Sequence, residues 1–220
     1  MYNINSYLSI EHLSISALCC LVIYLLLRYD EYTISKFLPF IIFLNESFYI
    51  LSKILNDSFS LSTHLPLELC YLTNVLIFAS IIFKFEMPFL YFASIFGALA
   101  GFINSNIANG DFFEYLRFYI GHSTLALFFI LSNKNHYRVN AQKYFSAIKM
   151  TSFLLFIIFI VNISISSNYW FMFEKPSGIN LTYLFPDWPH YFFILLSIGF
   201  IVYTITLFAN NYYYNNYRRT

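Results

Sequence analysis

The stretch PHYFFILLSIGFIVYTITLFA, residues 189–209, decides the fold class because it is long, apolar and free of Asp, Glu, Lys and Arg. A helix needs about 20 mainly apolar residues to cross the hydrocarbon core of a bilayer. Comparable runs recur along the chain, and they predict helices at 12–29, 37–54, 66–83, 87–107, 113–131, 145–165 and 189–209. We therefore predict an all-α polytopic membrane protein with seven transmembrane helices.

The composition supports one integral membrane domain that covers residues 1–220. Only 10% of the residues are charged, whereas a soluble domain carries about 25%. The polar breaks between the apolar runs are too short to form a separate soluble domain. The net charge of +1 gives no reason to expect a nucleic-acid partner.

The cysteines and the N-terminus exclude several other classes. Cys19 and Cys20 are adjacent inside an apolar run, and with Cys70 they give neither a disulfide framework nor a zinc spacing. We expect no metal and no cofactor. The first apolar run lacks a basic segment before it and a small-residue cleavage site after it, so it is expected to be a retained anchor.

The basic residues predict the orientation, because cytoplasmic loops retain Lys and Arg. With seven helices, nine of these residues fall on one side: Arg28, Lys36, Lys84, Lys134, Arg138, Lys143, Lys149, Arg218 and Arg219. Three fall on the other side: Lys53, Arg117 and Lys175. This bias places the N-terminus outside and the C-terminus in the cytoplasm.

Two candidate catalytic residues lie near the predicted outer side. Cys70 is expected about one turn into the third helix, and His122 lies inside the fifth. A thiolate is a nucleophile, and a neighbouring imidazole can take the proton of its thiol. The alternative for Cys70 is a small apolar filler. The alternative for His122 is a structural hydrogen bond between helices.

Three further polar residues are predicted inside the membrane. Asn74 shares the helix face of Cys70 and is a candidate oxyanion donor. Glu46 could orient His122, pair with Lys53 or Arg117, or hold helices together. Asn162 is expected to bond between helices.

The segment before the last helix is rich in aromatic residues and prolines. Lys175 could attract a phosphate headgroup, and Trp188 and Tyr191 could contribute to a lid over a lipid entrance. The alternative is an aromatic belt at the membrane interface with turns fixed by proline.

Four motifs occur in a family-specific order: LPLELCYLTNVL (65–76), YIGHSTLAL (119–127), NYWFMFEKPSGINLTYL (168–184) and FPDWPHYFFIL (185–195). In this order they resemble the YwaF-like integral membrane family, which includes animal transmembrane protein 164. The resemblance implies a phospholipid acyltransferase in which Cys70 carries the acyl group and His122 is the histidine partner. The family is distantly related to the androgen-induced-gene lipid hydrolases.

The expected reaction moves a fatty acyl chain from a phospholipid, through a thioester on Cys70, to a lysophospholipid. One alternative is a lipid ester hydrolase that uses the same pair. Others are a proton-coupled transporter built on Glu46, His122 and Asn162, and a purely structural membrane protein. We expect the protein in a bacterial cytoplasmic membrane, with its site toward the outer side.

Overall fold

The computed structural model describes residues 9–104, 110–176 and 180–217, and these residues form helices and connections without a strand. The helices are α1 (Ile10–Tyr29), α2 (Glu31–Leu55), α3 (Leu69–Phe83), α4 (Pro88–Ile103), α5 (Phe112–Lys134), α6 (Ala141–Ile165), η2 (Tyr169–Phe171), η3 (Leu181–Leu184) and α7 (His190–Tyr217). The all-α prediction is confirmed.

Polar capping residues explain why several helices extend beyond the predicted apolar runs. The side chain of Asp30 accepts a hydrogen bond from Thr33, so α2 begins six residues before the prediction. Asn140 caps α6 in the same way, and Asp111 forms a capping box with Glu114 at the start of α5. α4 ends at Ile103, and residues 105–107 of the predicted helix lie outside the described residues.

The start of α3 differs from the prediction. The helix begins at Leu69 with Glu68 as its N-cap, so Pro66 precedes the helix instead of occupying its first turn. The backbone before α3 is bound elsewhere, because Leu65 N–H donates to the Tyr169 hydroxyl and Leu67 C=O accepts from the Trp170 indole. Tertiary hydrogen bonds therefore keep residues 65–68 out of the helix.

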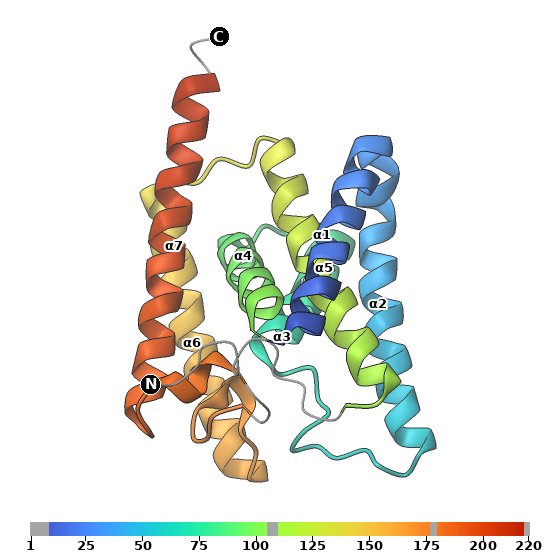
Figure 1. Cartoon of the computed structure of the whole chain (residues 1–220). Coiled ribbons are helices and arrows are strands. Elements are labelled where there is room, and N and C mark those ends of the chain that lie inside the picture. The colour runs from blue at the N-terminus through green and yellow to red at the C-terminus, as the bar shows by residue number, and fades with distance from the viewer. Residues whose placement is uncertain (1–8, 105–109, 177–179, 218–220) are drawn as a thin grey trace.

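α4 lies at the centre of the bundle and packs against α1, α3, α5, α6 and α7. In Figure 1, α6 and α7 lie on one side of α4, and α1, α2 and α5 lie on the other. The buried face of α4 contains the small residues Ala93, Ser94, Gly97, Ala98 and Gly101. Small residues allow helix backbones to approach closely where apolar side chains face lipid.

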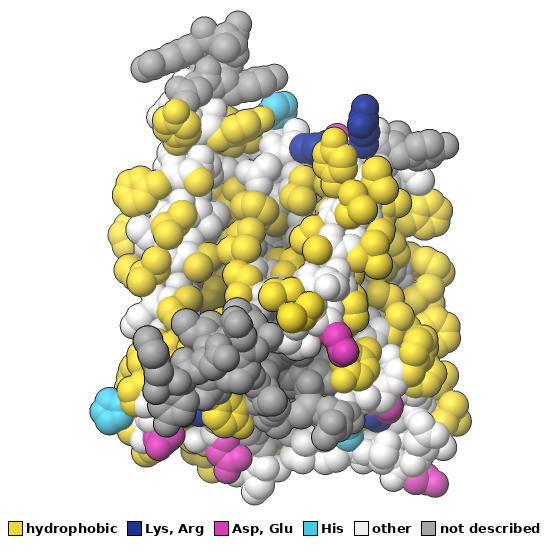
Figure 2. Space-filling view, in the orientation of Figure 1, with side chains coloured by type: hydrophobic (Ala, Val, Ile, Leu, Met, Phe, Trp, Pro, Cys, Tyr) yellow, Lys and Arg dark blue, Asp and Glu magenta, His cyan; other side chains and the backbone are white. Residues whose placement is uncertain are grey.

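Within the described residues, four helices are long and apolar enough to span a membrane: α1, α2, α6 and α7. α3 and α4 are apolar but shorter, and α5 has 23 residues. Many large apolar side chains are exposed on the helices, as Figure 2 shows for one face, where most charged side chains lie toward the two ends. This distribution suits a protein surrounded by lipid.

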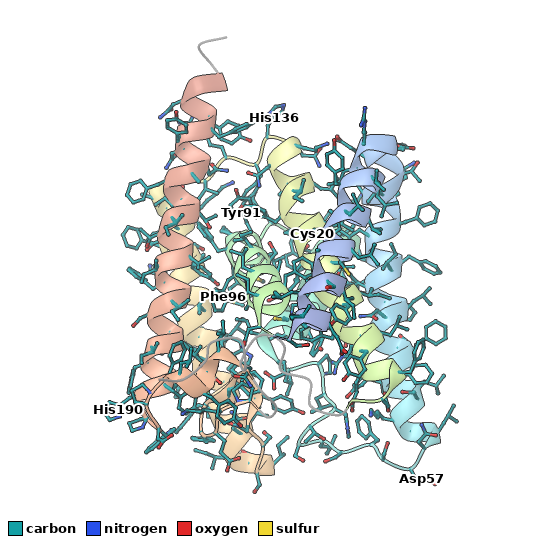
Figure 3. All side chains as sticks on the ribbon, in the orientation of Figure 1. Cys20, Asp57, Tyr91, Phe96, His136 and His190 are labelled. Atoms are coloured by element: carbon teal, nitrogen blue, oxygen red, sulfur yellow. The ribbon has the colours of Figure 1, made fainter. Side chains whose placement is uncertain are left out.

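The connections alternate between the two ends of the bundle. Residues 56–68, 166–176 and 180–189 lie at one end and residues 135–140 at the other (Figure 1). Figure 3 shows Asp57 and His190 at the first end and His136 at the opposite end. Lys53 forms ion pairs with Asp111 and Glu114 at the first end. Hydrogen bonding to Lys53 lowers the pKa of Asp111.

Candidate functional site

A cavity of about 180 Å³ lies at the end of the bundle where residues 56–68 and 166–176 meet. It is bounded by the start of α3, by α4, α5 and α7, and by the connection after α6. Its lining includes Glu68, Cys70, Tyr71, Phe96, Gly101, Phe118, His122, Trp170, Phe192 and Leu196. Cys70 and His122, which the sequence placed on separate helices, therefore face one space.

Two glycines of α4 make room for this pair. A methyl group on Gly97 would lie 3.1 Å from the Cys70 sulfur and 2.8 Å from Leu125 Cδ1. A methyl group on Gly101 would overlap the His122 ring at Nε2 and Cδ2. Residues four apart lie on the same face of a helix, about 5–6 Å from each other. The sulfur and the imidazole therefore lie against successive turns of α4.

The difference in depth between the two helix starts allows this arrangement. His122 lies ten residues into α5, about 15 Å along its axis, whereas Cys70 is the second residue of α3. The connection of residues 56–68 returns from the end of α2 into the bundle before α3 begins (Figure 1). α3 consequently starts deeper than α5, which brings its first turn to the level of His122.

Hydrogen bonding determines which nitrogen of His122 is free. Its Nδ1 lies 2.7 Å from the carbonyl oxygen of Phe118. A carbonyl only accepts hydrogen bonds, so Nδ1 carries the proton and Nε2 has an open lone pair. Within the part of the chain that the structure describes, no hydrogen bond engages Nε2. The imidazole is thus in the tautomer that can accept a proton at Nε2, the nitrogen on the side of the ring that faces Gly101.

Among the described residues, no side chain caps the start of α3. Cys70 lies in the first turn of α3, where the N–H groups of a helix have no intrahelical partner. Such groups carry partial positive charge and favour a thiolate or an oxyanion beside them. Asn74, the predicted oxyanion donor, lies one turn further in and does not line the cavity.

Asn74 instead connects α3 to α5. Its amide donates to the Gly121 carbonyl at 2.9 Å, and its oxygen accepts from the Thr124 hydroxyl at 3.0 Å. Asn74 is fully buried. These contacts support a structural role and do not support the expected contact with an oxyanion.

A buried ion pair lies behind the cavity. Arg117 donates from Nη2 to Glu46 Oε2 at 2.8 Å and from Nε at 3.0 Å. Its guanidinium carbon is 4.1 Å from the Tyr49 ring centre and 3.6 Å from that of Tyr71. The Tyr71 ring in turn meets the His122 ring edge to face at 6.3 Å. Of the partners considered for Glu46, the structure selects Arg117, which supports the cavity wall through Tyr71.

The connection after α6 forms the outer wall of the cavity. Asn162 fastens it, because its oxygen accepts from Tyr169 N–H and the Ser167 hydroxyl, and its amide donates to the Tyr169 carbonyl. Glu68 accepts from the backbone N–H of Trp170 at 3.0 Å. Trp170 has a left-handed φ of 61°, a conformation that is uncommon for residues other than glycine and is found at functional sites.

The three residues predicted at the lid hold this connection together. Lys175 donates to Asp187 at 3.0 Å and to the Phe185 carbonyl. The Trp188 indole donates to the Met172 carbonyl. The Tyr191 hydroxyl donates to the carbonyl oxygen of Phe171 at 2.6 Å. The charge of Lys175 is paired with Asp187. These contacts therefore favour a role in holding the connection in place over a role in binding a phosphate headgroup.

Glu68 and His12 are polar neighbours of the site that sequence reasoning missed. Glu68 lines the cavity, and its place two residues before Cys70 is the signal that could have indicated it. His12 on α1 lies 2.9 Å from both the Gly101 carbonyl and the Tyr119 hydroxyl. Nothing in the sequence spacing connects His12 with α4 or α5.

The fold and the cavity define a helical membrane protein with a thiol and an imidazole in one buried space. A family model described as the TMEM164 family matches residues 6–207. The chain belongs to this family, as the resemblance in the sequence indicated. No curated protein and no solved structure matches the chain significantly.

Proposed function

We propose that the protein is a membrane phospholipid acyltransferase in which Cys70 is the nucleophile and His122 is the base. The observation that carries this proposal is the shared cavity, in which the Nδ1 of His122 is occupied by a carbonyl and its Nε2 is open. Cysteine with a neighbouring histidine is a common arrangement for acyl transfer.

The first half-reaction forms a thioester. The Cys70 thiol gives its proton to His122 Nε2, and the sulfur attacks the ester carbonyl carbon of a phospholipid. The carbon–sulfur bond forms, the ester carbon–oxygen bond breaks, and the departing lysophospholipid oxygen takes the proton from Nε2. The first N–H groups of α3 stabilise the negative charge on the carbonyl oxygen.

The second half-reaction regenerates the thiol. A lysophospholipid hydroxyl gives its proton to His122 Nε2 and attacks the thioester carbon. The new ester carbon–oxygen bond forms as the carbon–sulfur bond breaks, and the sulfur recovers the proton. Two such steps replace one difficult transfer, and both use the same base.

The apolar walls favour transfer over hydrolysis. Phe96, Phe118, Trp170, Phe171 and Phe192 line the cavity, and an apolar enclosure limits access of water to the thioester. A lipid ester hydrolase would use the same pair with water as acceptor. A proton-coupled transporter would need an exchangeable carboxyl group, whereas Glu46 is bound to Arg117.

Mass spectrometry tests the proposal directly. Purified protein incubated with phosphatidylcholine should gain one acyl mass on the Cys70 peptide, and hydroxylamine should remove it. Cys70→Ala should abolish the adduct, and His122→Gln should reduce it by about 100-fold or more, because a general base contributes about 10²–10⁴-fold. Cys20→Ala, which alters an exposed thiol on α1, should leave it unchanged.

The fate of the adduct separates the two enzyme classes. Addition of lysophospholipid should transfer the acyl group and release free thiol. Release of free fatty acid at the same rate with and without lysophospholipid would instead indicate a hydrolase. Absence of any adduct from the folded, monodisperse protein would contradict both.

A further inference from the structure

A second cavity adjoins the first and leads along α7 toward its middle. Its volume is about 160 Å³. Both cavities are lined by Leu69, Phe96, Trp170, Leu195 and Leu196, and the second also by Ile148, Thr151, Ser152, Gly199, Phe200 and Tyr203. The space beside Cys70 therefore continues between α4, α6 and α7.

The lining of the second cavity is mainly apolar. None of the described residues that line it is charged. The hydroxyls of Thr151 and Tyr203 lie 3.3 Å apart, and Thr151 also donates to the Ala147 carbonyl, so these polar atoms are satisfied. Tyr203 is buried and packs on Phe92 with ring centres 5.1 Å apart. Thr151 and Tyr203 line the second cavity but not the first, and this pair is its floor on the side away from Cys70.

Gly199 and Phe96 mark the passage between the two cavities. Figure 3 shows Phe96 on the part of α4 that is directed toward α7. A methyl group on Gly199 would lie 3.7 Å from the Phe96 ring, so a small side chain is accommodated there but a large one would fill the space. From Leu195 to Tyr203 the cavity extends about 12 Å along α7.

We infer that this second cavity holds the fatty acyl chain that is transferred, with Gly199 and the Thr151–Tyr203 floor limiting its length. The inference rests on the proposed function, because the acyl carbon must reach Cys70. A hydrocarbon chain matches an uncharged, mainly apolar lining, and its ester end would then lie in the first cavity. Glu68, Asn104 and Thr182 in that first cavity provide the polar surroundings for the glycerol end.

Competition between two chain lengths tests the inference. The protein is incubated with equal amounts of dioctanoyl- and dipalmitoyl-phosphatidylcholine in mixed micelles, and the two adducts on the Cys70 peptide are quantified. Gly199→Phe should raise the ratio of octanoyl to palmitoyl adduct by at least about tenfold, since pocket contacts of this size discriminate by about 10–200-fold. Phe96→Ala should shift the ratio toward palmitoyl.

The control substitution lies on the outside of the same helix. Ile201→Phe adds a comparable side chain at a position that is 54% exposed and should leave the ratio unchanged. Gly199→Leu serves if Gly199→Phe does not fold. An unchanged ratio in the folded Gly199 and Phe96 variants would overturn the inference.

A second measurement does not require catalysis. A phosphatidylcholine with a diazirine at the end of one acyl chain is photolysed with the Cys70→Ser variant. Labels should concentrate on residues 148–152 and 199–203 and decrease with Gly199→Phe. If these segments are labelled but wild-type protein forms no acyl adduct, the second cavity binds an acyl chain and the proposed reaction is wrong. An adduct with labels elsewhere would reject the chain site alone.

Discussion

At the scale of single residues, the site depends on two glycines of α4 that leave room for the side chains of Cys70 and His122. Gly101 has no side chain where the His122 ring lies, and Gly97 has none beside the Cys70 sulfur. Because α4 is central, its backbone cannot withdraw without disturbing five neighbouring helices. The positions of Cys70 and His122 therefore require glycine at both 97 and 101.

Gly101→Ala should displace the His122 ring while leaving the bundle folded. A misplacement of about 1 Å can reduce rates by about 100-fold, so adduct formation on Cys70 should fall by that order. Leu99→Ala, on the same helix at a position that is 42% exposed, is the matched control. Normal adduct formation in folded Gly101→Ala protein would show that the imidazole position does not matter.

At the scale of elements, a buried ion pair joins α2 to α5. Glu46 and Arg117 are each less than a tenth exposed. Removing one partner of such a pair leaves a buried charge without compensation and typically costs about 3–5 kcal/mol. The guanidinium of Arg117 also packs on the ring of Tyr71, and Tyr71 lines the cavity.

Arg117→Met should lower the thermal stability in detergent by an amount that corresponds to about 3–5 kcal/mol. Adding Glu46→Met should recover much of this loss, because the second substitution removes the unpaired carboxylate. The comparison is made by scanning calorimetry of all four proteins in the cycle. Strictly additive losses would indicate that the two residues act independently.

Asn162 joins the end of α6 to the outer wall of the cavity. Asn162→Leu removes three hydrogen bonds, each with a net value of about 1 kcal/mol. The variant should show earlier proteolytic cleavage in residues 166–176 and a higher KM for phospholipid. Ser164→Ala, whose exposed hydroxyl donates to the Ile160 carbonyl within α6, should match wild type in both measurements.

At the scale of the whole molecule, we propose that the chain crosses the membrane seven times, with the cavity toward the outer side, and that α3 completes its crossing together with the returning connection of residues 56–68. Connections alternate between the two ends, and the predicted cytoplasmic side has nine Lys and Arg residues against three. α3 starts inside the bundle after a connection that returns from the outer end, which explains why it is too short for an independent span.

Cysteine labelling in intact cells tests this topology. In a chain with Cys19, Cys20 and Cys70 replaced by Ser, Ser58→Cys should react with a membrane-impermeant maleimide applied from outside. Asn135→Cys at the opposite end should react only after permeabilisation. Equal labelling of both positions in intact cells, or the reverse pattern, would refute the orientation.

The amino-acid sequence alone determined the helical class, the presence of α1–α7 and the candidate pair Cys70 and His122. Apolar runs report directly on helices in lipid, because charged groups are excluded there. The ends were less predictable: Asp30 and Asn140 extend helices beyond the apolar runs, and hydrogen bonds from a distant connection delay the start of α3.

Only the tertiary structure decided what surrounds the pair. The close approach of α3, α4 and α5 puts the Cys70 sulfur beside Gly97 and the His122 ring against Gly101. Packing also pairs Arg117 with Glu46 and directs the Asn74 amide to the Gly121 carbonyl. It also places the second cavity beside Cys70. The physical reason is that helix periodicity specifies which residues share a face, whereas packing between helices decides which face each one meets.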